Sequence, residues 1–188
     1  MCIGYKGRPG KGILLQFLLV FCIAFPCLAI AQSANEVKEM QVKAAYLYNF
    51  TKFVYWESPE GESQPASITI GFYHADLIAD FLEKFVASSV QKPAIIIKRI
   101  ANLDEGFSDC QLLYIDQSQK NDLPQILQRI KGSKVLTIGD MSGFAHKGGM
   151  IGFYLEDGRL KIEIDLTEVN NAGLKLSAKL IEVARIVK

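Results

Sequence analysis

The sequence predicts an α/β domain with a mostly parallel β-sheet and helices on both faces, as in flavodoxin-like or receiver-like folds. Two observations support this fold class. Short β-branched or aliphatic runs alternate with helix-like segments between residues 68 and 140, and this alternation is typical of parallel strands joined by crossover helices. After residue 140 the alternation stops, and Asp157-Gly158 between two strand-like runs indicates an antiparallel hairpin at one edge of the sheet.

Residues 1–31 have the pattern of a secretory signal peptide. A short segment with three basic residues and no acid precedes an apolar run over residues 13–31, which ends in a small-x-small sequence. A retained membrane anchor is the alternative, because the run is about as long as a membrane span. Pro26 and the small residues favour cleavage after Ala31. We therefore expect an exported chain, residues 32–188, that folds as a single domain.

The composition of the exported chain argues against several kinds of site. Loss of the three basic residues changes the net charge from +1 to −2, and no basic cluster remains, which argues against nucleic-acid binding. His74, His146 and the one remaining cysteine, Cys110, have no metal-ligand spacing, so we expect no metal or cofactor. Cys110 has no partner for an intramolecular disulfide. A buried thiol at the start of a strand is favoured over a reactive or dimer-linking one.

The first helix of the exported chain is expected to begin at a capping box, Ser33 to Glu36, and to continue to about residue 54. Its apolar residues surround nearly the whole cylinder, so the helix must be covered on more than one side. Tyr46, Phe50 and Phe53 are therefore predicted to anchor a homodimer interface. Burial of the same residues inside the monomer is the alternative.

The remaining elements follow from hydrophobic periodicity and turn residues. Parallel strands are predicted over residues 68–73, 94–100, 111–116 and 135–140, helices over 77–86 and 123–131, hairpin arms over 150–155 and 160–166, and two closing helices, one within 166–173 and one from Ser177. In the second hairpin arm, apolar and charged residues alternate strictly. This alternation places Glu163 on the solvent-facing side.

The glycine-rich residues 145–152 resemble a phosphate loop only in composition. Lys147 precedes the glycines and the next element is a strand, whereas a phosphate loop leads into a helix whose N-terminus points at the anion. We expect a flexible bend in which glycine supplies unusual backbone angles. The sequence also lacks a G-x-S-x-G elbow and a nucleophile–histidine–acid set, so no catalytic residues are predicted.

Two aspartates follow predicted parallel strands, where α/β folds place ligands. Asp116 and Asp140 lie at these positions, and Tyr73 ends the first strand. The three residues define a candidate cleft for a small ligand. The alternative is that the aspartates only terminate strands or cap helices.

Four segments carry a resemblance to a known family. They are VKAAYLYNFTKFVYWE (42–57), DCQLLYID (109–116), VLTIGD (135–140) and GGMIGFYLEDGRLKIEIDLTEVNNAGLKLSAKLIEVARIV (148–187). Together with their spacing, they resemble the YfiR-like family of exported proteins of Gram-negative bacteria, over essentially the whole exported chain.

The resemblance implies a periplasmic, usually dimeric regulator. Such a protein holds an inner-membrane diguanylate cyclase inactive by binding the cyclase's periplasmic sensor domain, so its loss raises cyclic-di-GMP and promotes biofilm. An outer-membrane lipoprotein relieves the inhibition by sequestering the regulator. The resemblance implies a partner-binding surface at Glu163 and Val169; the alternative for Glu163 is a solvated charge that protects a sheet edge.

The chain departs from the family pattern in its cysteines, because members with disulfides need several and this exported chain has only Cys110. Redox control is therefore not expected. A periplasmic module that binds a small ligand and tunes another sensor or transport system is the alternative function.

Overall fold

The structure is a computed structural model that describes residues 35–56, 65–87 and 93–187. Residues 35–39 are helical and belong to a unit separate from that of residues 40–187. In the second unit, residues 40–53 form a helix, here named the N-terminal helix. The predicted signal peptide and the start of the predicted capping box lie outside the described residues. Within those residues, no helix has the length and apolar content needed to cross a membrane.

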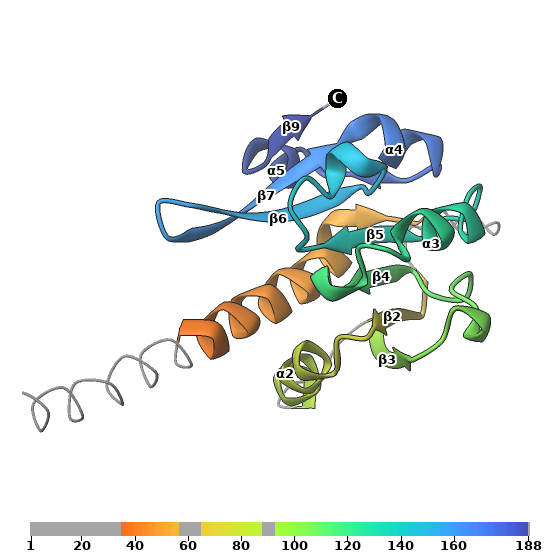
Figure 1. Cartoon of the computed structure of the whole chain (residues 1–188), viewed down its shortest axis with the longest axis horizontal. Coiled ribbons are helices and arrows are strands. Elements are labelled where there is room, and N and C mark those ends of the chain that lie inside the picture. The colour runs from red at the N-terminus through yellow and green to blue at the C-terminus, as the bar shows by residue number, and fades with distance from the viewer. Residues whose placement is uncertain (1–34, 57–64, 88–92, 188) are drawn as a thin grey trace, which may run out of the picture. The chain divides into compact units, whose positions relative to one another are not determined.

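Seven strands form the main sheet, in the order β3-β2-β4-β5-β6-β7-β9, which Figure 1 shows from one edge to the other. The first five strands in this order are parallel to their neighbours, β7 is antiparallel to β6, and β9 is parallel to β7. The order of these first five strands is that of flavodoxin-like folds. The predicted fold class is therefore confirmed. The strands are β2 (Ser67–Tyr73), β3 (Ala94–Ile100), β4 (Leu112–Ile115), β5 (Leu136–Gly139), β6 (Ile151–Glu156), β7 (Arg159–Asp165) and β9 (Arg185–Val187).

Short helices and a second, two-stranded sheet complete the described chain. The helices are α2 (Asp76–Ala87), α3 (Leu123–Arg129), α4 (Leu166–Asn171) and α5 (Ala178–Glu182), with 3-10 turns η1 (Leu103–Glu105), η2 (Gln117–Gln119) and η3 (Ala145–Lys147). The small sheet pairs β1 (Val54–Tyr55) with β8 (Lys175–Leu176).

The end of the chain differs from the sequence prediction. Ser177 caps α5 as expected, by accepting a hydrogen bond from the backbone N–H of Leu180, but the helix ends at Glu182. The β-branched residues Ile186 and Val187 then continue as β9, which pairs with β7. The predicted closing helix is therefore wrong in its second half. The hairpin of β6 and β7 lies one strand inside the edge of the sheet.

Two hydrophobic clusters form the core, one on each face of the sheet. Alternate residues of β4 show the separation, because Leu112 and Tyr114 belong to the first cluster whereas Leu113 and Ile115 belong to the second. The N-terminal helix and α2 contribute to the first cluster, and α3 contributes to the second. Helices thus cover both faces, as a parallel sheet requires.

The residues predicted to anchor a dimer lie in or against the first cluster. Phe50 is fully buried, and its ring centroid lies 6.3 Å from that of Phe153. Tyr46 also packs on Phe153, at 5.7 Å, and both Tyr46 and Phe53 are partly buried against the cluster. Burial within the monomer accounts for Phe50. A dimer interface through Tyr46 and Phe53 stays a prediction.

The glycine-rich segment makes room for the ring of Phe144. This ring is buried in the second cluster, between the backbones of Gly139 and Gly149. A Cβ at Gly149 would lie 2.2 Å from the ring, and one at Gly139 would lie 2.5 Å from it. Gly148 has a φ of 91°, which a side chain rarely permits. The glycines are therefore needed for close packing and for one backbone turn.

A buried ion pair joins the N-terminal helix to the end of β5. Lys43 Nζ lies 2.7 Å from Oδ2 of Asp140, and the two side chains are only 8% and 7% exposed. The second oxygen, Asp140 Oδ1, is buried and accepts no hydrogen bond from a described residue. Both charges are removed from water, so each one is tolerated in the interior only while the other compensates it.

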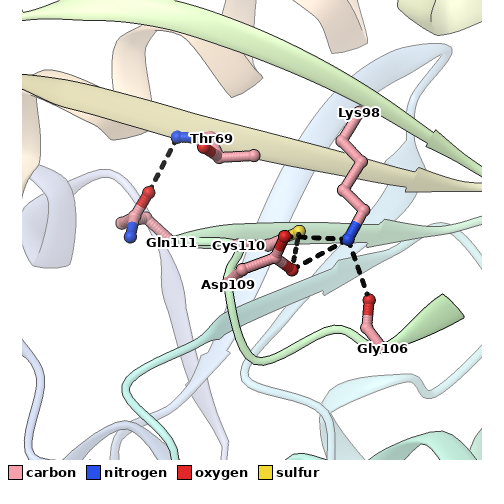
Figure 2. A network of polar contacts seen from close by, with 6 residues as sticks. All are labelled: Thr69, Lys98, Gly106, Asp109, Cys110 and Gln111. Carbon is pink, nitrogen blue, oxygen red and sulfur yellow. Dashed lines mark hydrogen bonds and ion pairs between the residues drawn. The ribbon is translucent and has the colours of Figure 1, made fainter.

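Cys110 lies in the second cluster, beside a small polar network (Figure 2). Burial raises the pKa of its thiol to about 11, so the thiol is protonated at neutral pH. Lys98 Nζ donates to the carboxylate of Asp109 at 2.9 Å and to the carbonyl of Gly106 at 3.2 Å. These contacts tie the loop before β4 to β3, and the buried position agrees with the favoured interpretation of this cysteine.

We expect Gly149→Ala to lower the free energy of unfolding by about 1–3 kcal/mol, because the added methyl group overpacks the ring of Phe144. Urea denaturation of the single variants and of Gly149→Ala with Phe144→Leu would measure it. The smaller side chain should recover part of the loss, as coupled neighbours do. An unchanged urea midpoint for Gly149→Ala would contradict this packing.

Lys43→Met should destabilise the fold by about 3–5 kcal/mol, because it leaves the Asp140 carboxylate buried without its cation. The double variant Lys43→Met with Asp140→Leu should recover most of the loss, since it removes both charges. Lys161→Met, which removes an exposed partner of Glu156, is the control and should change little. If Lys43→Met were as stable as this control in urea denaturation, the ion pair would have no structural role.

Candidate functional site

The three residues of the predicted cleft at the strand ends have separate partners. Tyr73 is buried, and its hydroxyl donates to Oδ2 of Asp122 at 2.9 Å. Burial and this hydrogen bond raise the pKa of Tyr73 to about 12. Asp116 accepts a hydrogen bond from the backbone N–H of Ser118, at 2.8 Å, as the cap of η2. Asp140 forms the ion pair with Lys43, so the structure does not direct these side chains into a common cleft.

Two cavities lie elsewhere on the domain. The larger, of about 680 Å³, lies between α3 and α4; it is lined by apolar residues such as Ile130 and by both Lys131 and Glu168. The smaller, of about 400 Å³, lies at the ends of β2 and β3 beside His74 and Arg99. In the described part of the chain, no three histidine, cysteine or acidic side chains group closely enough to hold a metal ion.

Glu163 is buried, contrary to the solvent-facing position that alternation predicts. It is 3% exposed, and β7 lies between β6 and β9, so it is not an edge strand of the sheet. Gly152 is the register partner of Glu163 on β6, and a Cβ at Gly152 would approach Oε1 of Glu163 to 3.0 Å. The missing side chain therefore leaves room for the carboxylate. The alternative of a solvated edge charge is also wrong.

The Glu163 carboxylate holds an exposed cation. Arg185 Nη2, from β9, donates to Oε2 of Glu163 at 2.5 Å. The guanidinium carbon lies 4.0 Å from the ring centroid of Tyr154, and the Arg185 side chain is half-exposed. The hydrogen bond to Glu163 is the main cause that raises the pKa of Arg185. A buried anion and an aromatic ring thus fix the position of one cation at the surface.

This surface has a defined set of residues, which we name the Arg185 face. Strand register places its members on one side of β6, β7 and β9, opposite the first hydrophobic cluster. Lys161 and Glu156 form an ion pair with each other at the hairpin end. The planar guanidinium of Arg185 suits bidentate binding of a carboxylate on another molecule. The residues of the Arg185 face are Tyr154, Glu156, Lys161, Glu163 and Arg185.

Val169 packs inside the domain. It is 1% exposed and lies in the first cluster, on the buried side of α4. Asp165 caps this helix by accepting hydrogen bonds from the backbone N–H groups of Thr167 and Glu168, at 2.8 and 3.2 Å. The side chain of Val169 therefore holds α4 in place and has little surface to offer a partner.

Sequence reasoning missed Arg185 and Tyr154 as residues of this site. Arg185 falls in a segment whose apolar spacing also fits a helix, so no strand register placed it beside Glu163. Tyr154 lies in a correctly predicted strand, but nothing local indicates a guanidinium over its ring. Knowledge of the pairing of β9 with β7 would have identified these residues. That pairing brings Glu163 and Arg185, which are 22 positions apart in the sequence, within hydrogen-bonding distance.

Comparisons with curated proteins and with solved structures give no information on function. Comparison with curated proteins gave no match. Among solved structures, an ABC domain in complex with L-Trp from Streptococcus pneumonia is 11% identical, with a TM-score of 0.48 over 64% of this chain and 55% of that chain. This weak likeness carries no functional argument.

A family model described as YfiR/HmsC-like matches residues 40–185, which include the N-terminal helix, both core clusters and the Arg185 face. That match confirms the resemblance seen in the sequence. The family implies a periplasmic regulator of diguanylate cyclase signalling. The chain belongs to the YfiR/HmsC-like family.

Proposed function

We propose that this protein is exported to the periplasm and inhibits an inner-membrane diguanylate cyclase by binding the periplasmic sensor domain of that cyclase. The regulator thereby lowers cyclic-di-GMP and restrains biofilm formation. The observation that carries the proposal is the family match over residues 40–185. A homodimer, and an outer-membrane lipoprotein that sequesters the regulator, belong to the same proposal.

The Arg185 face supports docking onto another macromolecule. Its central cation is fixed by Glu163 and Tyr154 before binding, so little side-chain entropy is lost when a partner carboxylate approaches. Arginine and tyrosine are also enriched among the residues that dominate interface energies. In this proposal, Arg185 contacts the sensor domain.

Glu163 and Val169 keep a role in partner binding, but as positioning residues. Glu163 is too buried to form a broad contact, and its carboxylate orients Arg185. Val169 lies on the buried side of α4, the helix that directly follows β7, and anchors that helix to the core. Substitution of either residue would act on the partner through the surface that it supports.

A ligand-binding role remains the second candidate because of the cavity between α3 and α4. Its volume of about 680 Å³ lies within the usual range for small-molecule sites. A ligand there would contact Glu168, next to Val169 in α4. Such a module could tune the inhibitor or another sensor or transport system.

The proposal is tested in a deletion strain of the bacterium that encodes the chain. Deletion should raise cyclic-di-GMP, and the wild-type gene should restore the parental level. Arg185→Glu should fail to restore it, because loss of a central interface arginine weakens binding by about tenfold or more. Lys179→Glu, an exposed lysine on α5, is the charge-matched control and should behave as wild type. Cyclic-di-GMP is measured by mass spectrometry, with equal amounts of each variant confirmed in periplasmic extracts.

Two results would contradict the proposal. One is an unchanged cyclic-di-GMP level in the deletion strain, together with no binding of the purified protein to any periplasmic sensor domain of that strain. The other is full restoration of the parental cyclic-di-GMP level by Arg185→Glu. That result would show that the protein inhibits the cyclase without using the Arg185 face.

A further inference from the structure

Helix α2 carries a second row of apolar side chains beside its buried one. Ile78, Ala79 and Leu82 face the core. Leu77 and Phe85 are 60% and 45% exposed, and with the partly buried Phe81 they repeat at every fourth residue. Residues with this spacing share one side of a helix. The row therefore forms a continuous apolar strip on the flank of α2.

The strip ends against the N-terminal helix. The ring of Tyr48 meets that of Phe85 edge-on, with centroids 5.0 Å apart. The Tyr48 ring is buried (9% exposed), so the exposed part of the strip lies on α2, on the face of the sheet opposite Glu163. We name this surface the α2 stripe. It consists of Tyr48, Leu77, Phe81 and Phe85.

Two lysines lie on the α2 stripe. Lys52 Nζ lies 4.0 Å from the ring centroid of Tyr48, and Lys84 Nζ lies 5.8 Å from that of Phe81. Neither ammonium group forms an ion pair with a carboxylate in residues 35–56, 65–87 or 93–187. The surface therefore combines exposed apolar side chains with two cations that lack a carboxylate partner there.

The acidic residues of α2 lie on its other flank. Arg99 Nη2, from β3, contacts Asp80 at 2.8 Å and Glu83 at 2.9 Å, and Arg99 Nη1 contacts Asp76 at 3.5 Å. Arg99 thereby supplies the positive charge that these three carboxylates contact. The acidic residues of α2 therefore lie on one flank of the helix. The apolar flank is bordered by the positive charges of Lys52 and Lys84.

We infer that the α2 stripe docks an amphipathic, acidic segment of a protein partner, whose apolar side chains cover Leu77 and Phe85 while its carboxylates pair with Lys52 and Lys84. Helical segments of this kind bind apolar surfaces through residues spaced three and four apart. The inference goes beyond the proposed function, because this surface lies on the opposite face of the sheet from Arg185 and would serve a separate contact.

Charge favours this occupant over two others. A second copy paired through the same stripe would bring like charges together, because the stripe offers lysines and no acid. An anionic membrane would gain only about 1 kcal/mol from each lysine near its surface. Two exposed apolar side chains add too little for stable membrane association. An amphipathic acidic segment can instead contact the apolar side chains and the two lysines at the same time.

The test is fluorescence anisotropy with a synthetic helical peptide of about 18 residues, or about five turns. The peptide carries leucines at spacings of three and four and glutamates elsewhere; a second peptide has lysine in place of glutamate. The full exported chain should bind the acidic peptide, and added salt should weaken binding. The lysine peptide should bind at least about tenfold more weakly.

Variants locate the binding on the molecule. Lys52→Glu with Lys84→Glu should lose at least about tenfold in affinity for the acidic peptide, and Phe85→Ser should lose a similar amount. Leu155→Ser, at an apolar residue of the hairpin that is more exposed than Phe85, and Lys120→Glu with Lys179→Glu, a charge-matched pair, are controls that should bind as wild type. Circular dichroism confirms that each variant is folded.

Arg185→Glu should bind the acidic peptide as wild type does, which separates this surface from the one proposed for the sensor domain. The inference is overturned if wild type does not bind the acidic peptide, or if the controls lose as much as the stripe variants. Binding to phosphatidylglycerol vesicles without binding to the peptide would also overturn it, in favour of a membrane surface.

Discussion

The central constraint on this structure is that a mostly parallel sheet has two apolar faces and both must be covered. The N-terminal helix and α2 meet the constraint on one face, and α3 with the buried ring of Phe144 meets it on the other. Covering the first face draws Lys43 of the helix into the interior, where Asp140 supplies its counter-charge. Covering the second face requires glycine backbones around Phe144. Loss of either cover would expose the buried surface that holds the five parallel strands together.

The same constraint determines where surfaces for partners remain. Beyond β5, the sheet continues into β6, β7 and β9, and Tyr154 and Arg185 on this part stay partly or largely exposed. Glu163 is buried between them and fixes Arg185 in place. On the opposite face, α2 has more large apolar side chains than its sheet-facing side can bury. Leu77 and Phe85 therefore stay at the surface. The two proposed contact surfaces therefore lie on opposite faces of one sheet.

Sequence reasoning succeeded where the signal is local. The β-branched run of β3 was predicted over residues 94–100, as observed, and Asp157-Gly158 forms the hairpin turn with positive φ at both residues. It failed where a non-local contact decides. The residues of β9 also fit a helical pattern, and only pairing with β7 makes them a strand. The burial of Glu163 depends on that pairing, and the partner of Asp140 lies 97 residues away.

The proposed contact through the Arg185 face can be measured by hydrogen exchange with mass spectrometry on residues 32–188, with and without the periplasmic sensor domain of the proposed partner cyclase. We expect slower exchange in β6 and β7 (residues 151–165) and in β9 (residues 185–187) when the sensor domain is bound, because binding there excludes water and suppresses opening of these strands. Unchanged exchange in these strands in the presence of a bound sensor domain would contradict it.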